Sequence, residues 1–219
     1  MIPRLFLIAA TLAVLAACGP ADKPKSAPAA PPSVVVTRPA GADGLIDRFT
    51  PYLGGPLALD EYSVGPIMGP TEFSLEAIKP RFPNAEVKAA FLHEGEGEPT
   101  PIITVAQGGG VLEIQGNPGG RTVGDIRITG GTPQGPRGEI LDLKWVDADL
   151  DYPRCWSGKD RDAHAVICTQ PGEPVLRYVF AVPGWTQDAM PPEATLRDKA
   201  VLREFFWRGG APVGPPAVP

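Results

Sequence analysis

The sequence predicts a mainly β protein: an antiparallel, β-sandwich-like single domain with one or two short helices. Glycine and proline are frequent, at 26 and 28 of 219 residues, and they separate short apolar segments, as in turn-rich β proteins. Several of these segments alternate apolar and polar residues, which is the period of a strand with one buried face. Residues 33–208 remain once the terminal segments are set aside, and such a length buries one core unaided.

Residues 1–17 have the three parts of a secretion signal, beginning with the positive charge of Arg4. An apolar stretch at 5–14 follows, and small residues end the segment. Counted on to Cys18, this run is about 14 residues long, which is shorter than the roughly 20 that a membrane-spanning helix needs. We therefore expect a cleaved signal peptide rather than a transmembrane anchor.

The signal ends in Leu15-Ala16-Ala17-Cys18, which resembles the bacterial lipobox. This resemblance implies that Cys18 carries the lipid, palmitate included, and becomes the new N-terminus. Gly19 follows, and not the Asp associated with inner-membrane retention, so the resemblance implies an outer-membrane lipoprotein facing the periplasm. The alternative is a plain secreted protein whose signal ends near an incidental cysteine.

Residues 18–32 comprise the lipidated cysteine and a tether rich in proline and alanine. Such a composition buries too little apolar surface to offset the entropy of ordering the chain. The formal net charge of −5 gives no basic surface for nucleic acid or for anionic lipid. The expected membrane attachment therefore depends on the acyl chains.

Residues 33–208 form the predicted periplasmic domain. We expect a first strand at 33–37 and a short amphipathic helical segment at 45–53. The clearest helix begins at Ser74, whose side chain suits an N-cap, and Pro80 is expected to end it.

Successive strands are expected through the rest of the domain, and the aromatic residues at 205–207 are expected in the core. Glycine-rich turns at 108–110 and 119–120 favour an antiparallel meander inside a sandwich or barrel. A disordered tail rich in glycine and proline is expected at 209–219. The expected strands lie at 87–92, 102–105, 111–114, 123–129, 175–182 and 201–207.

The chain has three cysteines, and Cys155 and Cys168 remain as a pair once Cys18 is acylated. An even remainder in an oxidising envelope compartment predicts one disulfide. Its expected role is to staple the polar loop 156–164.

Asp147, Asp149 and Asp151 have the alternate spacing that opens a calcium-binding loop. The rest of the loop is missing, because Tyr152 stands where a glycine is needed and Gly158 where a bidentate glutamate is needed. The pattern is therefore that of a solvated acidic turn, with a weak cation site as the alternative.

Several short motifs follow one another in a fixed order in the second half of the chain, and together they resemble one family. They resemble the sigma-E (envelope-stress) regulated bacterial lipoproteins, a domain family of unknown function. Weaker similarities at Val64-Gly65, Thr71 and 124–128 extend the resemblance over roughly residues 60–208. The resemblance implies a mainly β, sandwich-like fold and lends no catalytic residues. Where the family has a short helix before its first loop cysteine, this chain has an Asp-rich stretch ending in Pro153. The pieces are Cys155, Ala165-Val166, Cys168, Tyr178-x-Phe180, Gly184-Trp185, Met190-Pro191, Leu196 and Trp207-Arg208.

No catalytic or cofactor motif stands out in the sequence. It has no Gly-x-Ser-x-Gly elbow, and its two histidines, His93 and His164, lack a metal-ligand spacing. We therefore expect a non-enzymatic envelope interaction or integrity protein with an envelope protein as partner and no cofactor. The alternative is a cell-wall or glycan ligand-binding or hydrolytic module that uses Trp156 and Trp185, which lie beside polar loops.

Overall fold

The computed structural model describes residues 49–94 and 97–209. The predicted signal peptide, Cys18, the tether, the strand at 33–37 and the part of the tail beyond residue 209 lie outside this range.

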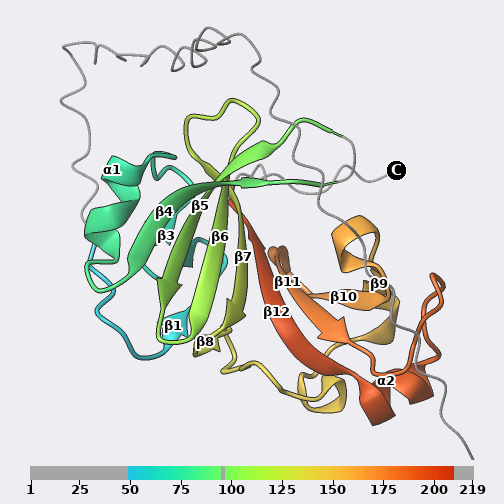
Figure 1. The fold of residues 1–219 in the computed structure, drawn as a ribbon. Helices are drawn as coiled ribbons and strands as arrows, with labels where there is room; N and C mark the ends of the chain where they lie inside the picture. The colour runs from blue at the N-terminus through green and yellow to red at the C-terminus, as the bar shows by residue number, and fades with distance from the viewer. Residues whose placement is uncertain (1–48, 95–96, 210–219) are drawn as a thin grey trace, which may run out of the picture. The chain divides into compact units, whose positions relative to one another are not determined.

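A curved antiparallel sheet forms the body of the domain (Figure 1). It has eight strands in the order β4-β5-β6-β7-β12-β11-β10-β9, so the last strand in the chain lies at its centre. The mainly β, antiparallel single-domain prediction is confirmed, and the long strands are joined in one continuous hydrogen-bonded sheet. The strands are β4 (Glu86–Leu92), β5 (Thr100–Gln107), β6 (Gly110–Gly116), β7 (Val123–Gly130), β9 (Cys155–Ser157), β10 (Ala165–Gln170), β11 (Glu173–Ala181) and β12 (Val201–Arg208).

Short elements complete the fold. The parallel pair β1 (Leu57–Ala58) and β8 (Pro133–Gln134) and the antiparallel pair β2 (Ser63–Val64) and β3 (Ile67–Met68) form two small sheets. The α-helices are α1 (Leu75–Ile78) and α2 (Glu193–Lys199), and 3-10 helices cover Lys79–Arg81, Trp145–Asp147, Tyr152–Arg154 and Asp160–Asp162. Within the described ranges, no helix has the length and apolarity required to cross a membrane.

The predicted helix start at Ser74 is confirmed. Its side chain accepts a hydrogen bond of 3.2 Å from the Ala77 amide, which satisfies one of the free N–H groups of the first turn. Pro80 ends α1 as expected, and the chain continues into the 3-10 helix Lys79–Arg81. The chain at 49–53 is extended rather than helical, because the Tyr52 amide donates to the Arg81 carbonyl instead of to its own segment.

Alternation along the strands places one face of the sheet in the core and the other outside. In β12, Phe205 and Trp207 are almost fully buried in the core, together with Ile126 and Ile128 of β7. Tyr178 of β11 packs edge-to-face on Phe205, with 5.5 Å between ring centroids. The strands expected at 87–92, 102–105, 111–114, 123–129, 175–182 and 201–207 are confirmed, whereas β9, β10 and α2 were not predicted.

Candidate functional site

A row of polar and aromatic side chains crosses the outer face of the sheet. Arg177 of β11 lies opposite Phe206 of β12, Phe206 opposite Arg127 of β7, and Arg127 opposite Glu113 of β6. Residues directly opposite one another in neighbouring strands share a face. The expectation that Phe206 is a core residue is therefore wrong, because the alternation of β12 turns it away from its buried neighbour Phe205.

The loop between β9 and β10 folds back over this row. Its 3-10 helix carries Asp162, which accepts hydrogen bonds of 2.8 and 2.7 Å from the two terminal nitrogens of Arg127. Arg161 donates to Glu113, with 2.9 Å between Nη2 and Oε1. Two ion pairs therefore fix the tip of the loop to the middle of the sheet.

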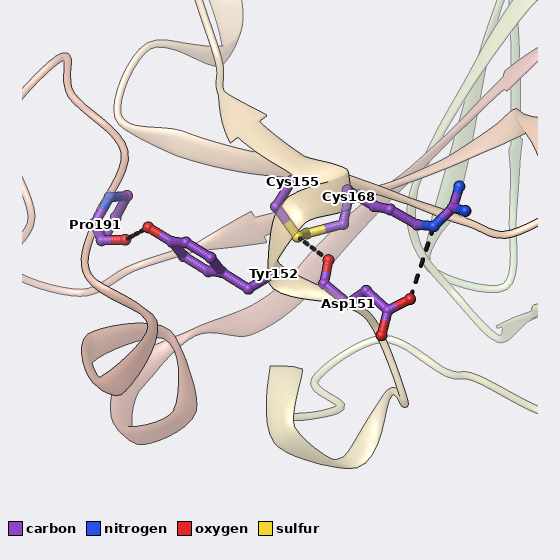
Figure 2. The surroundings of a disulfide bond; sticks show 6 residues. Asp151, Tyr152, Cys155, Cys168 and Pro191 are labelled. Atoms are coloured by element: carbon purple, nitrogen blue, oxygen red, sulfur yellow. Dashed lines mark hydrogen bonds and ion pairs between the residues drawn. A yellow bond between two sulfur atoms is a disulfide. The ribbon is translucent and has the colours of Figure 1, made fainter.

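A disulfide fixes the other end of the loop (Figure 2). Cys155 of β9 is bonded to Cys168 of β10, at a sequence separation of 13, which confirms the predicted pairing. The segment before it is held as well, because the Tyr152 hydroxyl donates to the Pro191 carbonyl at 2.9 Å. Cross-link and ion pairs together hold the loop against the outer face.

Arg127 is shared between two carboxylates. It also forms an ion pair with Glu204 of β12, and the three side chains are 12–16% exposed. Burial lowers the pKa of Arg127, but the hydrogen bonds and charges of Asp162 and Glu204 outweigh it and raise that pKa. Burial raises the pKa of Glu204, and this effect, together with the like charge of Asp162, outweighs the lowering effect of Arg127.

Arg177 differs from Arg127 in having no ion-pair partner among the described carboxylates. Its guanidinium carbon lies 5.5 Å from the ring centroids of both Trp156 and Phe206. Its Nε is buried and has no hydrogen-bond partner within the described part of the chain. Burial lowers the pKa of Arg177, and the charge of Arg208 lowers it further; the charges of Asp125 and Asp162 act in the opposite direction but do not outweigh these effects.

A cavity of about 50 Å³ adjoins the Arg177 side chain. Three of its lining residues are polar and charged, and three are apolar or aromatic. Charged groups and apolar or aromatic surface therefore meet in this cavity, which suits recognition through charge and apolar contact. The lining residues are Arg127, Asp162, Ile167, Arg177, Val179 and Phe206.

The structure separates the two tryptophans that were expected to share a surface. Trp156 is 39% exposed and faces outward beside Arg177, opposite Ile167 in the neighbouring strand. Trp185 packs instead against the hydrophobic core, and its Nε1 donates to the Ala189 carbonyl at 3.0 Å. Only Trp156 therefore belongs to the outer-face site.

The three aspartates of the candidate cation site do not converge. Asp149 is 94% exposed and pairs with Arg137 at 3.2 Å, and Asp151 pairs with Arg154 at 3.7 Å. Asp147 does not join them in a metal site. Among residues 49–94 and 97–209, no group of three or more His, Cys, Asp or Glu side chains is arranged to hold a metal ion. The geometry is that of a solvated acidic turn.

The fold is similar to that of one solved bacterial protein. The crystal structure of the uncharacterized protein yfeY from Escherichia coli aligns with a TM-score of 0.55 and 18% sequence identity. The alignment covers 70% of this chain and 99% of that chain. No protein-family model and no curated protein sequence matches the chain. The similarity therefore establishes a shared fold with an uncharacterized bacterial protein.

Proposed function

We propose that this chain is an outer-membrane-anchored lipoprotein whose domain faces the periplasm and acts by binding, without catalysis, in envelope interaction or integrity. The observation that carries the proposal is the apolar signal ending in Leu15-Ala16-Ala17-Cys18. The disulfide between Cys155 and Cys168 supports an oxidising compartment, where such bonds persist. The sequence resemblance to the sigma-E regulated lipoproteins gives the same address.

The outer face supports a binding role. It combines an exposed indole at Trp156 with an arginine, Arg177, that lacks a carboxylate partner in the described chain. The cavity beside Arg177 measures about 50 Å³, far below the roughly 300 Å³ at which pockets enclose a drug-sized ligand. A face of this kind suits contact with a group presented by a larger partner.

Metabolic labelling with an alkyne analogue of palmitate tests the anchor. We expect the protein to incorporate the label and to fractionate with the outer membrane, and the Cys18→Ser variant to do neither. A variant lacking Cys155 and Cys168 is the matched control and should keep the label. Label that survives in Cys18→Ser, or wild-type protein that carries none, would contradict the proposal.

A second candidate is a glycan-binding module, which the exposed ring of Trp156 favours. Cell-wall glycan fragments should then bind with a change in tryptophan fluorescence, and Trp156→Ala should abolish that change. A fluorescence change that persists in this variant would remove the candidate.

A further inference from the structure

We infer that the outer-face site binds a singly charged carboxylate borne on an apolar or aromatic group, with Arg177 as the anion-binding residue. The inference rests on the proposed binding role and names the chemistry that this face recognises. It does not depend on the lipid anchor.

The first argument is the state of Arg177 itself. Its Nε is buried without a hydrogen-bond acceptor in the described chain, and no carboxylate described there lies within ion-pair distance. A buried donor without an acceptor is unfavourable, even where the rest of the side chain is only half-buried. Neighbouring arginines show the contrast, because Arg127 pairs with Asp162 and Arg208 with Asp125. An external anion would supply the missing acceptor.

The second argument is the way in which the guanidinium is held. Trp156 and Phe206 both lie 5.5 Å from its central carbon, and cation–π contacts of this kind restrict the orientation of the side chain. A planar guanidinium held in one orientation matches a carboxylate, which accepts two parallel hydrogen bonds. Less entropy is then lost when the ligand binds.

The third argument is the charge around the site. Asp162 and Glu204 both lie close to Arg127, so any anion beside Arg177 approaches two other acids. The resulting repulsion grows with the charge of the ligand, which disfavours a doubly charged phosphate relative to a singly charged carboxylate.

The fourth argument is the shape and polarity of the cavity. At about 50 Å³ it has room for roughly three or four water molecules, which is the scale of one carboxylate group rather than of a whole ligand. Ile167 and Val179 form an apolar wall, and Trp156 is exposed nearby. The body of the ligand therefore lies over apolar and aromatic surface while its carboxylate faces Arg177.

Benzoate is a suitable probe, with its neutral analogue benzamide and inorganic phosphate as comparisons. The full chain in a non-ionic detergent is titrated with each, and the Nε–H resonance of Arg177 is followed by NMR. We expect benzoate to shift this resonance saturably. Benzamide should bind at least about tenfold more weakly because it forms no charge-assisted hydrogen bond. Phosphate should also bind at least about tenfold more weakly, because its greater charge is repelled by the nearby acids and it has no apolar body.

Arg177→Met keeps a long side chain between the two rings, and it should weaken benzoate binding, measured by calorimetry, by about tenfold or more. Arg203→Gln removes the same charge from an exposed side chain that pairs with Asp142, and should change the affinity by less than about twofold. If Arg177→Met does not fold, Arg177→Lys retains the charge and should still bind benzoate more weakly than the wild type.

Three outcomes would overturn the inference: no saturable benzoate binding, equal binding of benzoate and benzamide, or equal losses in Arg177→Met and Arg203→Gln. Stronger binding of phosphate than of benzoate would also reject the carboxylate assignment. Palmitate labelling does not depend on any of these results, so failure here and failure of the proposed anchor are distinguishable.

Discussion

Replacing Asp162 by Asn should destabilise the fold more than replacing Glu204 by Gln, although both acids pair with Arg127. Asp162 accepts two hydrogen bonds of 2.8 and 2.7 Å from Arg127 and ties the β9–β10 loop to the sheet. A charge-assisted hydrogen bond contributes about 1.5–3 kcal/mol, and breaking a fully buried pair costs about 3–5 kcal/mol. Because these side chains are 12% and 16% exposed and Arg127 keeps Glu204, we expect a loss of about 2–3 kcal/mol.

Glu204→Gln should change the free energy of unfolding at pH 7 by less than about 1 kcal/mol, since the lost attraction to Arg127 is offset by relief of the buried charge. The effect should also depend on pH. The folded-state pKa of Glu204 is raised, so the folded protein holds a proton that the unfolded chain has released. The contribution of Glu204 to the free energy of unfolding therefore falls as pH rises from about 4 through the raised pKa. Over that interval the stability of Glu204→Gln should increase relative to that of the wild type.

Urea unfolding followed by tryptophan fluorescence measures both effects, provided that the m-value stays constant among the variants. Measurements at pH 7 and at about pH 4 give the pH term for Glu204→Gln. The reasoning is refuted if Glu204→Gln is as destabilising as Asp162→Asn at pH 7, or if its disadvantage grows as pH rises.

Two further predictions concern the disulfide and a strained turn. Replacing Cys155 and Cys168 by Ala should lower the free energy of unfolding by about 3 kcal/mol, the entropy of closing the loop, measured by urea unfolding against the oxidised wild type; no change would mean that the ion pairs alone hold the loop. Gly130→Ala should cost roughly 1–3 kcal/mol in the same measurement, because φ is +64° and an added Cβ would lie 2.5 Å from the Gly109 carbonyl oxygen. Gly172→Ala, at φ +80° with no atom within 4 Å, is the control and should cost less than Gly130→Ala.

Local patterns were enough to predict much of the fold. The strands at 123–129 and 201–207 follow from alternation, which is a property of neighbouring residues in a strand. The start of α1 followed from Ser74, because capping involves only the first turn of a helix. Strand β9 is only Cys155–Ser157, too short to show a period, so its place at the sheet edge was not visible.

The outer-face site was predicted only in part. Trp156 was chosen for its position beside a polar loop, and the structure places it next to Arg177. Alternation along their strands marked Arg127 and Arg177 as outward-facing. Every alternating strand turns its polar residues outward, however, so this pattern did not single out these two arginines. Their chemical roles depend on which strands are neighbours and in which register.

The sequence by itself predicted three things: the cellular address, from Cys18; the strand content; and the pairing of Cys155 with Cys168. Each depends on a short segment or on the number of cysteines. Tertiary structure alone decided that β12 lies between β7 and β11. That placement brings Glu204 to Arg127 across 77 residues of sequence. Such contacts are set by strand order and register, which arise when the whole sheet buries its apolar face, and no local pattern specifies them.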